Sequence, residues 1–292
     1  MDTRRWRAAA YGALGRIPGP PPRGLAKPIF VIGTGRSGTT LLVQILQAHR
    51  DVVAYPSEAN ELWHPEAYPY DRRSIDLPPI LLDPAEFTRR SLSAWSPARE
   101  RAIRRTFSGF MRVWGRGRRL LLKSAMVSFM VEHLLRVCPD AMFVHIYRNG
   151  PSVASSLVKK EWPKYRGRID EGELRLRCAK YWNDCLVELH RADRALDLTG
   201  RGQLFECAYE RLCADPHGVV RQMSAFLGLD PDAYRFEWSA ILSRNEKVGD
   251  VTADPSWTTA LAAMRDAGRL KGYLASGAGQ PAAGAGSLSD SA

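Results

Sequence analysis

The sequence predicts an α/β fold with three layers, in which a mainly parallel central sheet is flanked by helices on both faces. Short apolar runs alternate with longer segments of helical spacing along much of the chain. Such alternation of strand, helix and strand is typical of parallel sheets that helices cover on both sides. A glycine-rich, P-loop-like loop of the kind that binds phosphate follows the first of these runs.

Five apolar runs are short enough to be buried strands. They cover residues 28–32, 52–55, 120–122, 141–147 and 203–207. Helices are predicted after the first run, where four apolar residues recur at helical spacing (Leu41, Leu42, Ile45 and Leu46), and over residues 127–137. The clearest amphipathic helix is 173–194, and we assign its apolar face, including Tyr181, to core packing.

The folded domain is predicted over residues 28–274. Its flanks are a basic arm at 1–27 and an Ala, Gly and Ser tail at 275–292, which we expect to be disordered. The arm carries six cationic residues against Asp2 and ends in a proline-rich stretch, so we predict a flexible, solvated arm. Contact of the arm with a membrane surface or an acidic partner is the alternative. Residues 59–118, rich in Trp, Pro, Tyr and Arg, are predicted to be an insertion over the carboxyl ends of the strands, where ligands bind in open parallel sheets.

Composition narrows the class of protein. The chain has 292 residues, 45% of them hydrophobic and 25% charged, which is enough to bury a sizeable core. Forty-two Lys and Arg against 31 Asp and Glu give a net charge of +11, which favours an anionic partner: a nucleic acid, an acidic lipid or a phosphorylated small molecule. No apolar stretch approaches the roughly 18 residues of a spanning helix. Five cysteines without a C-x-x-C pair indicate reduced thiols, and we predict a cytoplasmic protein.

The first candidate anion site is the segment Phe30–Leu42, which reads FVIGTGRSGTTLL. A buried strand runs into a glycine loop and then into a helix, so backbone N–H groups and the positive end of the helix converge on one point. The expected ligand is a phosphate or another tetrahedral oxyanion.

Three loop patterns fit this segment. Its glycines match the dinucleotide-binding G-x-G-x-x-G, with Glu58 placed 20 residues after the last of them, although Arg36 stands where small residues normally face the pyrophosphate. Gly33 and Gly38 also have the spacing of the nucleoside triphosphate loop G-x-x-x-x-G-K-[ST], but Thr39 replaces the lysine, which weakens a kinase or ATPase. The third pattern is G-R-S-G-T-T.

The third pattern resembles the 5′-phosphosulfate loop of sulfotransferases that use 3′-phosphoadenosine 5′-phosphosulfate (PAPS). The resemblance implies that Arg36 grips the sulfonyl group and the bridging oxygen. It also implies that four residues cradle the 5′-phosphate: Ser37, Gly38, Thr39 and Thr40. An arginine suits this role because its fork donates several charge-assisted hydrogen bonds to developing negative charge.

A second candidate anion site follows the strand at 141–147. Arg148 stands at the strand end and Ser156 eight positions later, an order that resembles the 3′-phosphate motif of the same family. Lys160, four residues further on the same helix face, would add charge to that phosphate. The alternatives are a surface arginine, a helix-face hydroxyl and a solvated lysine.

Two looser matches extend the resemblance over about residues 28–229. Lys123, after the strand at 120–122, matches a lysine near the transferred sulfonyl group, and Tyr209 matches a tyrosine that can approach the adenine. A strand-end surface charge and a core aromatic residue are the alternatives.

Sulfonyl transfer to an alcohol needs a group that accepts the hydroxyl proton. Cytosolic small-molecule members place a histidine just after the matched lysine, where this chain has Ala125 and Met126. Protein-tyrosine and heparan-type members use a glutamate downstream of the first loop, so we rank Glu58 first, Glu61 second and His64 third. The alternative is an acidic helix N-terminus. No metal site is predicted, because the histidines are scattered and the donor already carries a good leaving group.

We therefore predict a PAPS-dependent sulfotransferase acting on a hydroxyl-bearing small molecule or glycan, with no specific nucleic-acid partner. Carbohydrate, glycolipid, phenol and tyrosine acceptors all stay open, as does the oligomeric state. A nucleotide kinase or other phosphotransferase, and a non-catalytic anion-binding or nucleic-acid-binding protein, are the rival functions. Five aromatic residues of the insertion would either line the acceptor site or simply pack it: Trp63, Tyr68, Tyr70, Trp95 and Trp114.

Overall fold

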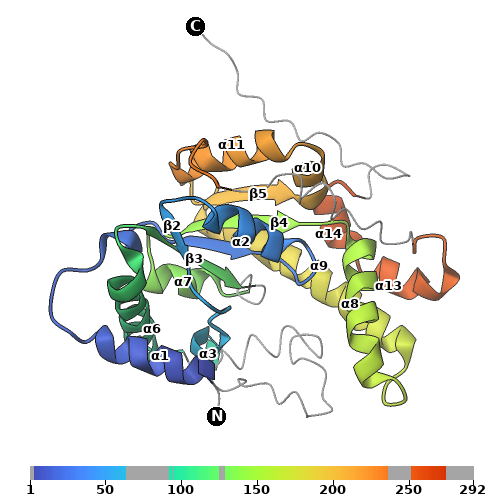
Figure 1. Cartoon of the computed structure of the whole chain (residues 1–292). Coiled ribbons are helices and arrows are strands. Elements are labelled where there is room, and N and C mark those ends of the chain that lie inside the picture. The colour runs from blue at the N-terminus through green and yellow to red at the C-terminus, as the bar shows by residue number, and fades with distance from the viewer. Residues whose placement is uncertain (1–2, 64–91, 94, 125–128, 236–250, 274–292) are drawn as a thin grey trace, which may run out of the picture.

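The structure of the protein, a computed structural model, describes residues 3–63, 92–93, 95–124, 129–235 and 251–273 (Figure 1). Its centre is a five-stranded sheet in the order β2-β3-β1-β4-β5. The strands are β1 (Ile29–Ile32), β2 (Val52–Ala54), β3 (Arg119–Ser124), β4 (Met142–Tyr147) and β5 (Leu204–Ala208). All four pairings are parallel, so the predicted fold class is confirmed.

The register of the sheet explains the composition of its strands. Ile29 of the central strand β1 lies between Leu121 of β3 and Met142 of β4. Successive side chains point to opposite faces of a sheet, and helices cover both faces here. Every residue of β1 is therefore buried and apolar.

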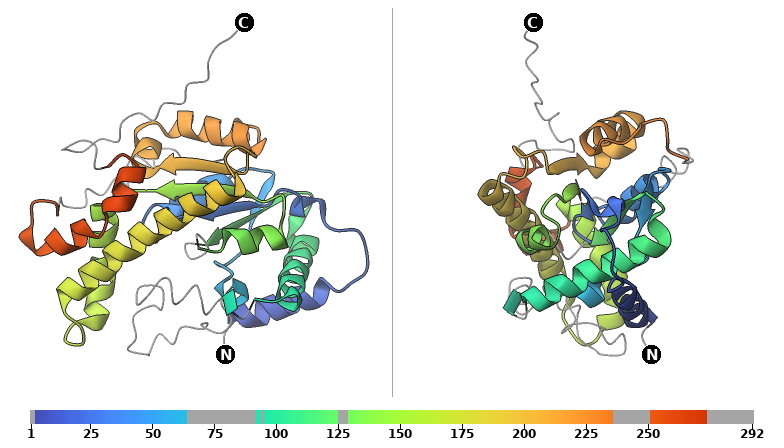
Figure 2. Two further views of the ribbon diagram at one scale, coloured as in Figure 1. Left: turned by 180° about the vertical axis from the view of Figure 1, so that it is seen from behind. Right: turned by 90° about the vertical axis from the view of Figure 1, so that its left-hand side faces the viewer.

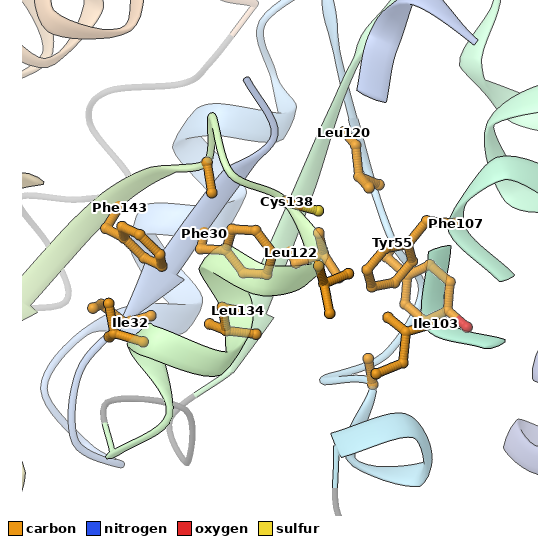
Figure 3. Packing of buried hydrophobic residues seen from close by; sticks show 14 of the residues in the cluster. Phe30, Ile32, Tyr55, Ile103, Phe107, Leu120, Leu122, Leu134, Cys138 and Phe143 are labelled. Atoms are coloured by element: carbon orange, nitrogen blue, oxygen red, sulfur yellow. The ribbon is translucent and has the colours of Figure 1, made fainter. Parts of the chain in front are cut away.

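Helices form a layer on each side of the sheet (Figures 1 and 2). One face is covered by α2 (Thr39–Gln47), α10 (Tyr209–Ala214) and α11 (Pro216–Leu227). The other face is covered by α6 (Pro97–Phe110), α7 (Val131–Val137) and α9 (Glu171–Leu196). In Figure 3, Phe30 and Phe143 of the sheet lie beside Leu134 of α7, and Leu122 lies between them and Phe107 of α6.

A separate apolar cluster fixes the helix that follows β4. This helix, α8 (Gly150–Tyr165), packs against α9. The short helices α13 (Thr258–Ala262) and α14 (Arg265–Leu270) complete the cluster around Trp182. The far end of the described chain thereby packs mainly on α9, in the same apolar cluster as α8, the helix that carries Ser156.

The N-terminal segment differs from the predicted flexible arm. Residues Thr3–Leu14 form helix α1, which packs against α6. The two backbones approach closely: a Cβ on Gly109 would lie 1.8 Å from the carbonyl oxygen of Tyr11, and one on Gly15 would lie 1.9 Å from that of Arg105. The count of charges suggested a solvated arm, whereas small residues at the crossing allow a packed helix.

The described part of the predicted insertion at 59–118 also has a different place. Helix α3 (Asn60–Trp63) and α6 contribute to the core on one face of the sheet, with Trp63 and Phe107 in edge-to-face contact at 5.7 Å between ring centroids. Residues 64–91 and 94 of this range, and the predicted tail at 275–292, lie outside the described residues. Among the residues that are described, no helix combines the length and apolar character needed to cross a membrane.

Candidate active site at the carboxyl edge of the sheet

The loop after β1 takes a path that only glycine allows at two points. Gly33 has a φ of 147°, and a Cβ there would lie 2.2 Å from the carbonyl oxygen of Ile146. Gly38 has a φ of 97°, and a Cβ there would lie 2.5 Å from Cδ2 of Tyr209. Helix α2 begins directly after Gly38 and has no side-chain cap at that residue. Its first-turn N–H groups, from Thr39 and Thr40 onward, are therefore directed toward an anion site.

Other loop groups are engaged within the protein. Ser37 is fully buried, and its hydroxyl hydrogen-bonds to the hydroxyl of Thr34. The Gly35 N–H donates to the hydroxyl of Tyr181 on α9 at 3.1 Å. Burial raises the pKa of Tyr181 well above its ordinary value, which keeps this phenol neutral. Sequence reasoning had assigned Tyr181 to the core alone.

Arg36 joins the first candidate anion site to the second. Its Nε donates to Oγ of Ser156 on α8 at 2.9 Å. The backbone of Arg36 has a φ of 72°, a left-handed conformation that costs a residue with a side chain about 1–3 kcal/mol. Strain of this kind persists only where the surrounding structure fixes the residue, and it is common at ligand-binding sites. Here it holds a cationic side chain at the junction of the two motifs.

Arg148 and Tyr209 form the second part of the site. The guanidinium carbon of Arg148 lies 4.4 Å from the centroid of the Tyr209 ring, a cation–π contact. The backbone carbonyl of Arg148 accepts a hydrogen bond from Nε1 of Trp182 at 3.0 Å. Burial raises the pKa of Tyr209 to about 12. Because the Tyr209 ring also contacts Gly38, it stands between the first loop and Arg148.

The start of α8 is braced by residues that sequence reasoning missed. The Asn149 N–H donates to Oε1 of Glu210 at 2.9 Å, and the Tyr273 hydroxyl donates to Oε2 of the same carboxylate at 3.0 Å. The side chain of Asn149 caps α8 by accepting from the Ser152 N–H at 3.2 Å. The Asn149 cap could be recognised from the local sequence. The contact with Glu210 could not, since Glu210 and Asn149 are 61 positions apart.

Lys123 forms an ion pair with Glu58, the first-ranked candidate for the general base. Its Nζ lies 2.8 Å from Oε1 of Glu58 and donates to Oγ1 of Thr40 at 3.0 Å. The side chains of Lys123 and Glu58 are 23% and 35% exposed, which leaves the pair open to a ligand. Ala59, directly after Glu58, has a left-handed φ of 53°. The fold thus brings together a carboxylate, an ammonium and the first turn of α2.

The other candidate bases are placed differently. Glu61 is only 8% exposed, and its Oε1 accepts a hydrogen bond from the Ser57 hydroxyl at 3.1 Å. Its Oε2 is buried and has no partner within the described part of the chain. Glu61 lies in the first turn of α3, the alternative position considered from the sequence. His64 lies outside the described residues.

Lys160 pairs with a neighbouring carboxylate. The ammonium of Lys160 lies 3.0 Å from Oε1 of Glu161, and the ammonium of Lys164 lies 2.7 Å from Oε2 of the same carboxylate. Burial alone raises the pKa of Glu161, but the hydrogen bonds from Lys164 and Lys160 outweigh it, so that this pKa lies below its ordinary value.

The predicted aromatic wall is divided among several places. Trp63 is buried in the core, Trp95 donates from Nε1 to Glu100 at 3.0 Å, and Trp114 is half-exposed beside α1. Tyr68 and Tyr70 lie outside the described residues. In the described ranges no group of three or more His, Cys, Asp or Glu side chains is arranged to hold a metal ion.

Comparison with known proteins bears directly on this arrangement. A family model described as "Sulfotransferase family" matches residues 28–233. An omega-hydroxy-beta-dihydromenaquinone-9 sulfotransferase, Stf3, from Mycobacterium bovis is 24% identical over 258 residues, and the same protein of Mycobacterium tuberculosis matches equally. That alignment covers 69% of this chain and 63% of the relative, so the chain matches less than two thirds of the relative's length.

A solved structure shares the fold. The sulfotransferase STF9 from Mycobacterium avium superimposes with a TM-score of 0.52 at 17% identity, over 79% of this chain and 70% of that one. At this identity the likeness concerns the fold, and the family assignment depends on the sequence match. Since that match covers most of the chain and includes both anion motifs, the chain belongs to the sulfotransferase family.

Proposed function

We propose that this protein transfers a sulfonyl group from PAPS to a hydroxyl group of an acceptor. The observation that carries the proposal is the junction of the two anion motifs, where Arg36 of the first loop donates to Ser156 of the second at 2.9 Å. Tyr209 supports it by contacting both Gly38 and Arg148. A ligand with a phosphosulfate at one end and a second phosphate at the other fits two joined anion sites better than a single phosphate does.

Each part of the donor has a proposed set of partners. The first-turn N–H groups of α2 and the Thr40 hydroxyl bind the 5′-phosphate, and Arg36 binds the sulfonyl group and the bridging oxygen. Arg148 and Ser156 bind the 3′-phosphate, and Tyr209 approaches the adenine as in the family. Lys160 is left out of this set because its ammonium pairs with Glu161.

The proposed reaction is an in-line displacement at sulfur. Glu58 accepts the proton of the acceptor hydroxyl while the acceptor oxygen bonds to sulfur. The bond from sulfur to the bridging phosphate oxygen breaks, and adenosine 3′,5′-bisphosphate leaves with the electron pair. Arg36 and Lys123 stabilise the charge on the sulfonyl and departing oxygens. The contacts of the Lys123 ammonium with both Glu58 and Thr40 support this role.

The acceptor is proposed at the level of its chemical group, a hydroxyl. The printed name of the mycobacterial relative describes a hydroxylated menaquinone as that protein's acceptor. A lipid alcohol therefore joins carbohydrates, phenols and tyrosine as a candidate for this chain. A cytoplasmic location is part of the proposal, supported by five cysteines that are all free and buried.

The donor site is tested by calorimetry with adenosine 3′,5′-bisphosphate, AMP and ATP. We expect tight binding of the bisphosphate alone, and a loss of about 10- to 100-fold in Arg148→Ala, since a hydrogen bond to a charged group contributes about 1.5–3 kcal/mol. Arg201→Ala, at an exposed turn before β5, is the matched control and should bind normally. Equal affinity for all three nucleotides would refute the donor assignment, and magnesium-dependent preference for ATP would favour a phosphotransferase.

A further inference from the structure

An exposed surface that is both apolar and basic lies at one end of the molecule. Six large hydrophobic side chains are exposed among the described residues, and five of them gather on α1, the linker after it and the turn η2 (Met111–Gly115): Trp6, Leu14, Ile17, Val113 and Trp114. The sixth, Leu270, ends α14. We define the α1 surface as these five residues together with five nearby basic residues: Arg5, Arg7, Arg16, Arg112 and Arg116. Helix α1 is an outermost helix in Figures 1 and 2.

Helix α1 packs against the protein through Ala8 and Tyr11 and leaves Trp6, Ala10 and Ala13 exposed on its other side. Each residue turns the helix by about 100°. Ala8 and Tyr11 lie on the side that packs against α6, so Trp6 falls on the opposite, outer side, and Leu14, about 80° from Trp6, lies at the edge of that side. Arg5 and Arg7 lie on the two flanks between these faces. An apolar stripe with basic flanks is typical of helices that lie in the interface of a bilayer.

The turn η2 extends this stripe with a second apolar pair, Val113 and Trp114. Nε1 of Trp114 donates to the hydroxyl of Tyr11 on α1 at 3.0 Å. The guanidinium of Arg112 donates to the carbonyls of Gly19 and Pro20 in the linker, each at 3.4 Å. Contacts across more than 90 positions of sequence therefore hold the two apolar segments together as one surface.

The charge around the stripe determines which partner it fits. Residues 1–27 carry six Lys and Arg against one acidic residue, and Arg112 and Arg116 of the η2 region are exposed as well. A polyanion such as duplex DNA would account for the arginines but not for exposed Leu14, Ile17 and Val113. An anionic bilayer accounts for both, since arginine heads reach lipid phosphates while Trp and aliphatic side chains enter the interface.

We propose that the α1 surface docks this protein on anionic lipid bilayers. Helix α1 packs against α3, which begins two residues after Glu58. Docking would therefore bring the Glu58 side of the candidate site toward the bilayer. The docking itself does not depend on the proposed sulfonyl transfer, because it involves none of the donor-binding residues.

The test is flotation of the full chain with vesicles of phosphatidylcholine alone and of phosphatidylcholine with phosphatidylglycerol. We expect binding to the anionic vesicles that weakens with added salt, and little binding to the neutral ones. The variant Trp6→Ser/Ile17→Ser should lower the partition coefficient at least about tenfold, since it removes two large apolar side chains whose burial in the interface favours binding. Leu270→Ser is the matched control, with a comparably exposed apolar side chain elsewhere, and should partition like the native chain.

The contribution of charge is tested by the same flotation assay, and self-association is tested by sedimentation. Arg7→Gln/Arg16→Gln should reduce binding to anionic vesicles and flatten its salt dependence, whereas Arg201→Gln should not. The proposal is overturned if the native chain does not float, if Leu270→Ser loses as much binding as the double variant, or if sedimentation shows that the native chain is a dimer which Trp6→Ser/Ile17→Ser dissociates. Unchanged melting temperature and bisphosphate binding of the double variant would show that its fold and donor site are intact.

Discussion

Replacing Gly38 with alanine tests whether the first loop, Tyr209 and Arg148 form one packed unit. A Cβ on Gly38 would lie 2.5 Å from Cδ2 of Tyr209 and 3.1 Å from Cδ1 of Ile146. Carbon atoms in favourable contact are about 3.5–4.0 Å apart, so the aromatic ring has to move. Since the Arg148 guanidinium lies 4.4 Å from the centroid of that ring, displacement of the ring should disturb the second anion site too.

The expected loss of unfolding free energy in Gly38→Ala combines three contributions. A left-handed conformation costs a residue with a Cβ about 1–2 kcal/mol. Overpacking against a fixed neighbour costs about 1–3 kcal/mol. Reduced freedom of the unfolded chain returns about 0.4–1 kcal/mol. We therefore expect Gly38→Ala to lose about 1–4.5 kcal/mol of unfolding free energy, which is the sum of the first two contributions less the third.

Gly202→Ala is the matched control, because Gly202 also has a positive φ, 63°, but no atom within 4 Å of its added Cβ. We expect it to lose about 1 kcal/mol or less, from the backbone alone. Urea denaturation measures both free energies, and calorimetry with adenosine 3′,5′-bisphosphate measures the site. In the double variant Gly38→Ala/Tyr209→Ala the overlap is gone, so the stability cost of the alanine should shrink. Equal losses in Gly38→Ala and Gly202→Ala would refute the packing argument.

Two further predictions concern proton transfer and acid stability. Glu58→Gln should lower the rate of sulfonyl transfer to a responsive acceptor by about 10²- to 10⁴-fold with bisphosphate affinity nearly unchanged, the usual contribution of a general base. Glu61→Gln is its control, and a larger loss there in rapid-quench assays would reverse the assignment. Burial alone raises the pKa of Glu206, but the hydrogen bond and charge of His145, with Lys271, outweigh it and lower this pKa from 4.5 to about 2. The stability from ionised Glu206 is thus complete above about pH 4.5 and is lost as the pH falls toward 2, so the difference in melting temperature between the native chain and Glu206→Gln should shrink over that range; a constant difference would contradict it.

The strands were predictable because helices cover the sheet on both faces. Strands of this kind are almost wholly apolar, so each one stands out as a short run between polar loops. The run at 203–207 corresponds to β5 at Leu204–Ala208, and the run at 141–147 corresponds to β4 at Met142–Tyr147. The order of the strands in the sheet had no such local signal, since β1 pairs with strands that follow it by about 90 and 110 residues.

Helix α1 was missed for a related reason. Its sequence has no large apolar face directed inward, and its arginines suggested a solvated segment. The packing depends on Gly15 of the linker and Gly109 of α6, which let the two backbones approach. Neither glycine predicts a helix crossing until the other is known to lie opposite it.

The candidate site shows the same division between local motifs and long-range contacts. The proximity of Arg36, Lys123 and Arg148 was predictable, because the first and last follow a strand, Lys123 lies near the end of one, and the carboxyl ends of parallel strands meet at one edge. Tyr181 was not, since its place on the apolar stripe of α9 is fully explained by core packing. A buried phenol needs a hydrogen-bond partner, but only the fold reveals that the partner is the Gly35 N–H.

That contact changes how the glycine loop is understood. A loop of this kind is usually pictured with its successive N–H groups all directed at the anion, yet here two of them serve the protein. The Gly35 N–H donates to Tyr181, and the Ser37 N–H donates to the Thr34 carbonyl at 3.2 Å. In the proposed donor site, the 5′-phosphate is then left to the other N–H groups of the loop, the first turn of α2 and the Thr40 hydroxyl, while the cations Arg36 and Lys123 act on the sulfonyl and departing oxygens. The electrostatic part of the site should accordingly outweigh its backbone cradle, which is consistent with the basic Arg36 where nucleotide-binding loops have a small residue.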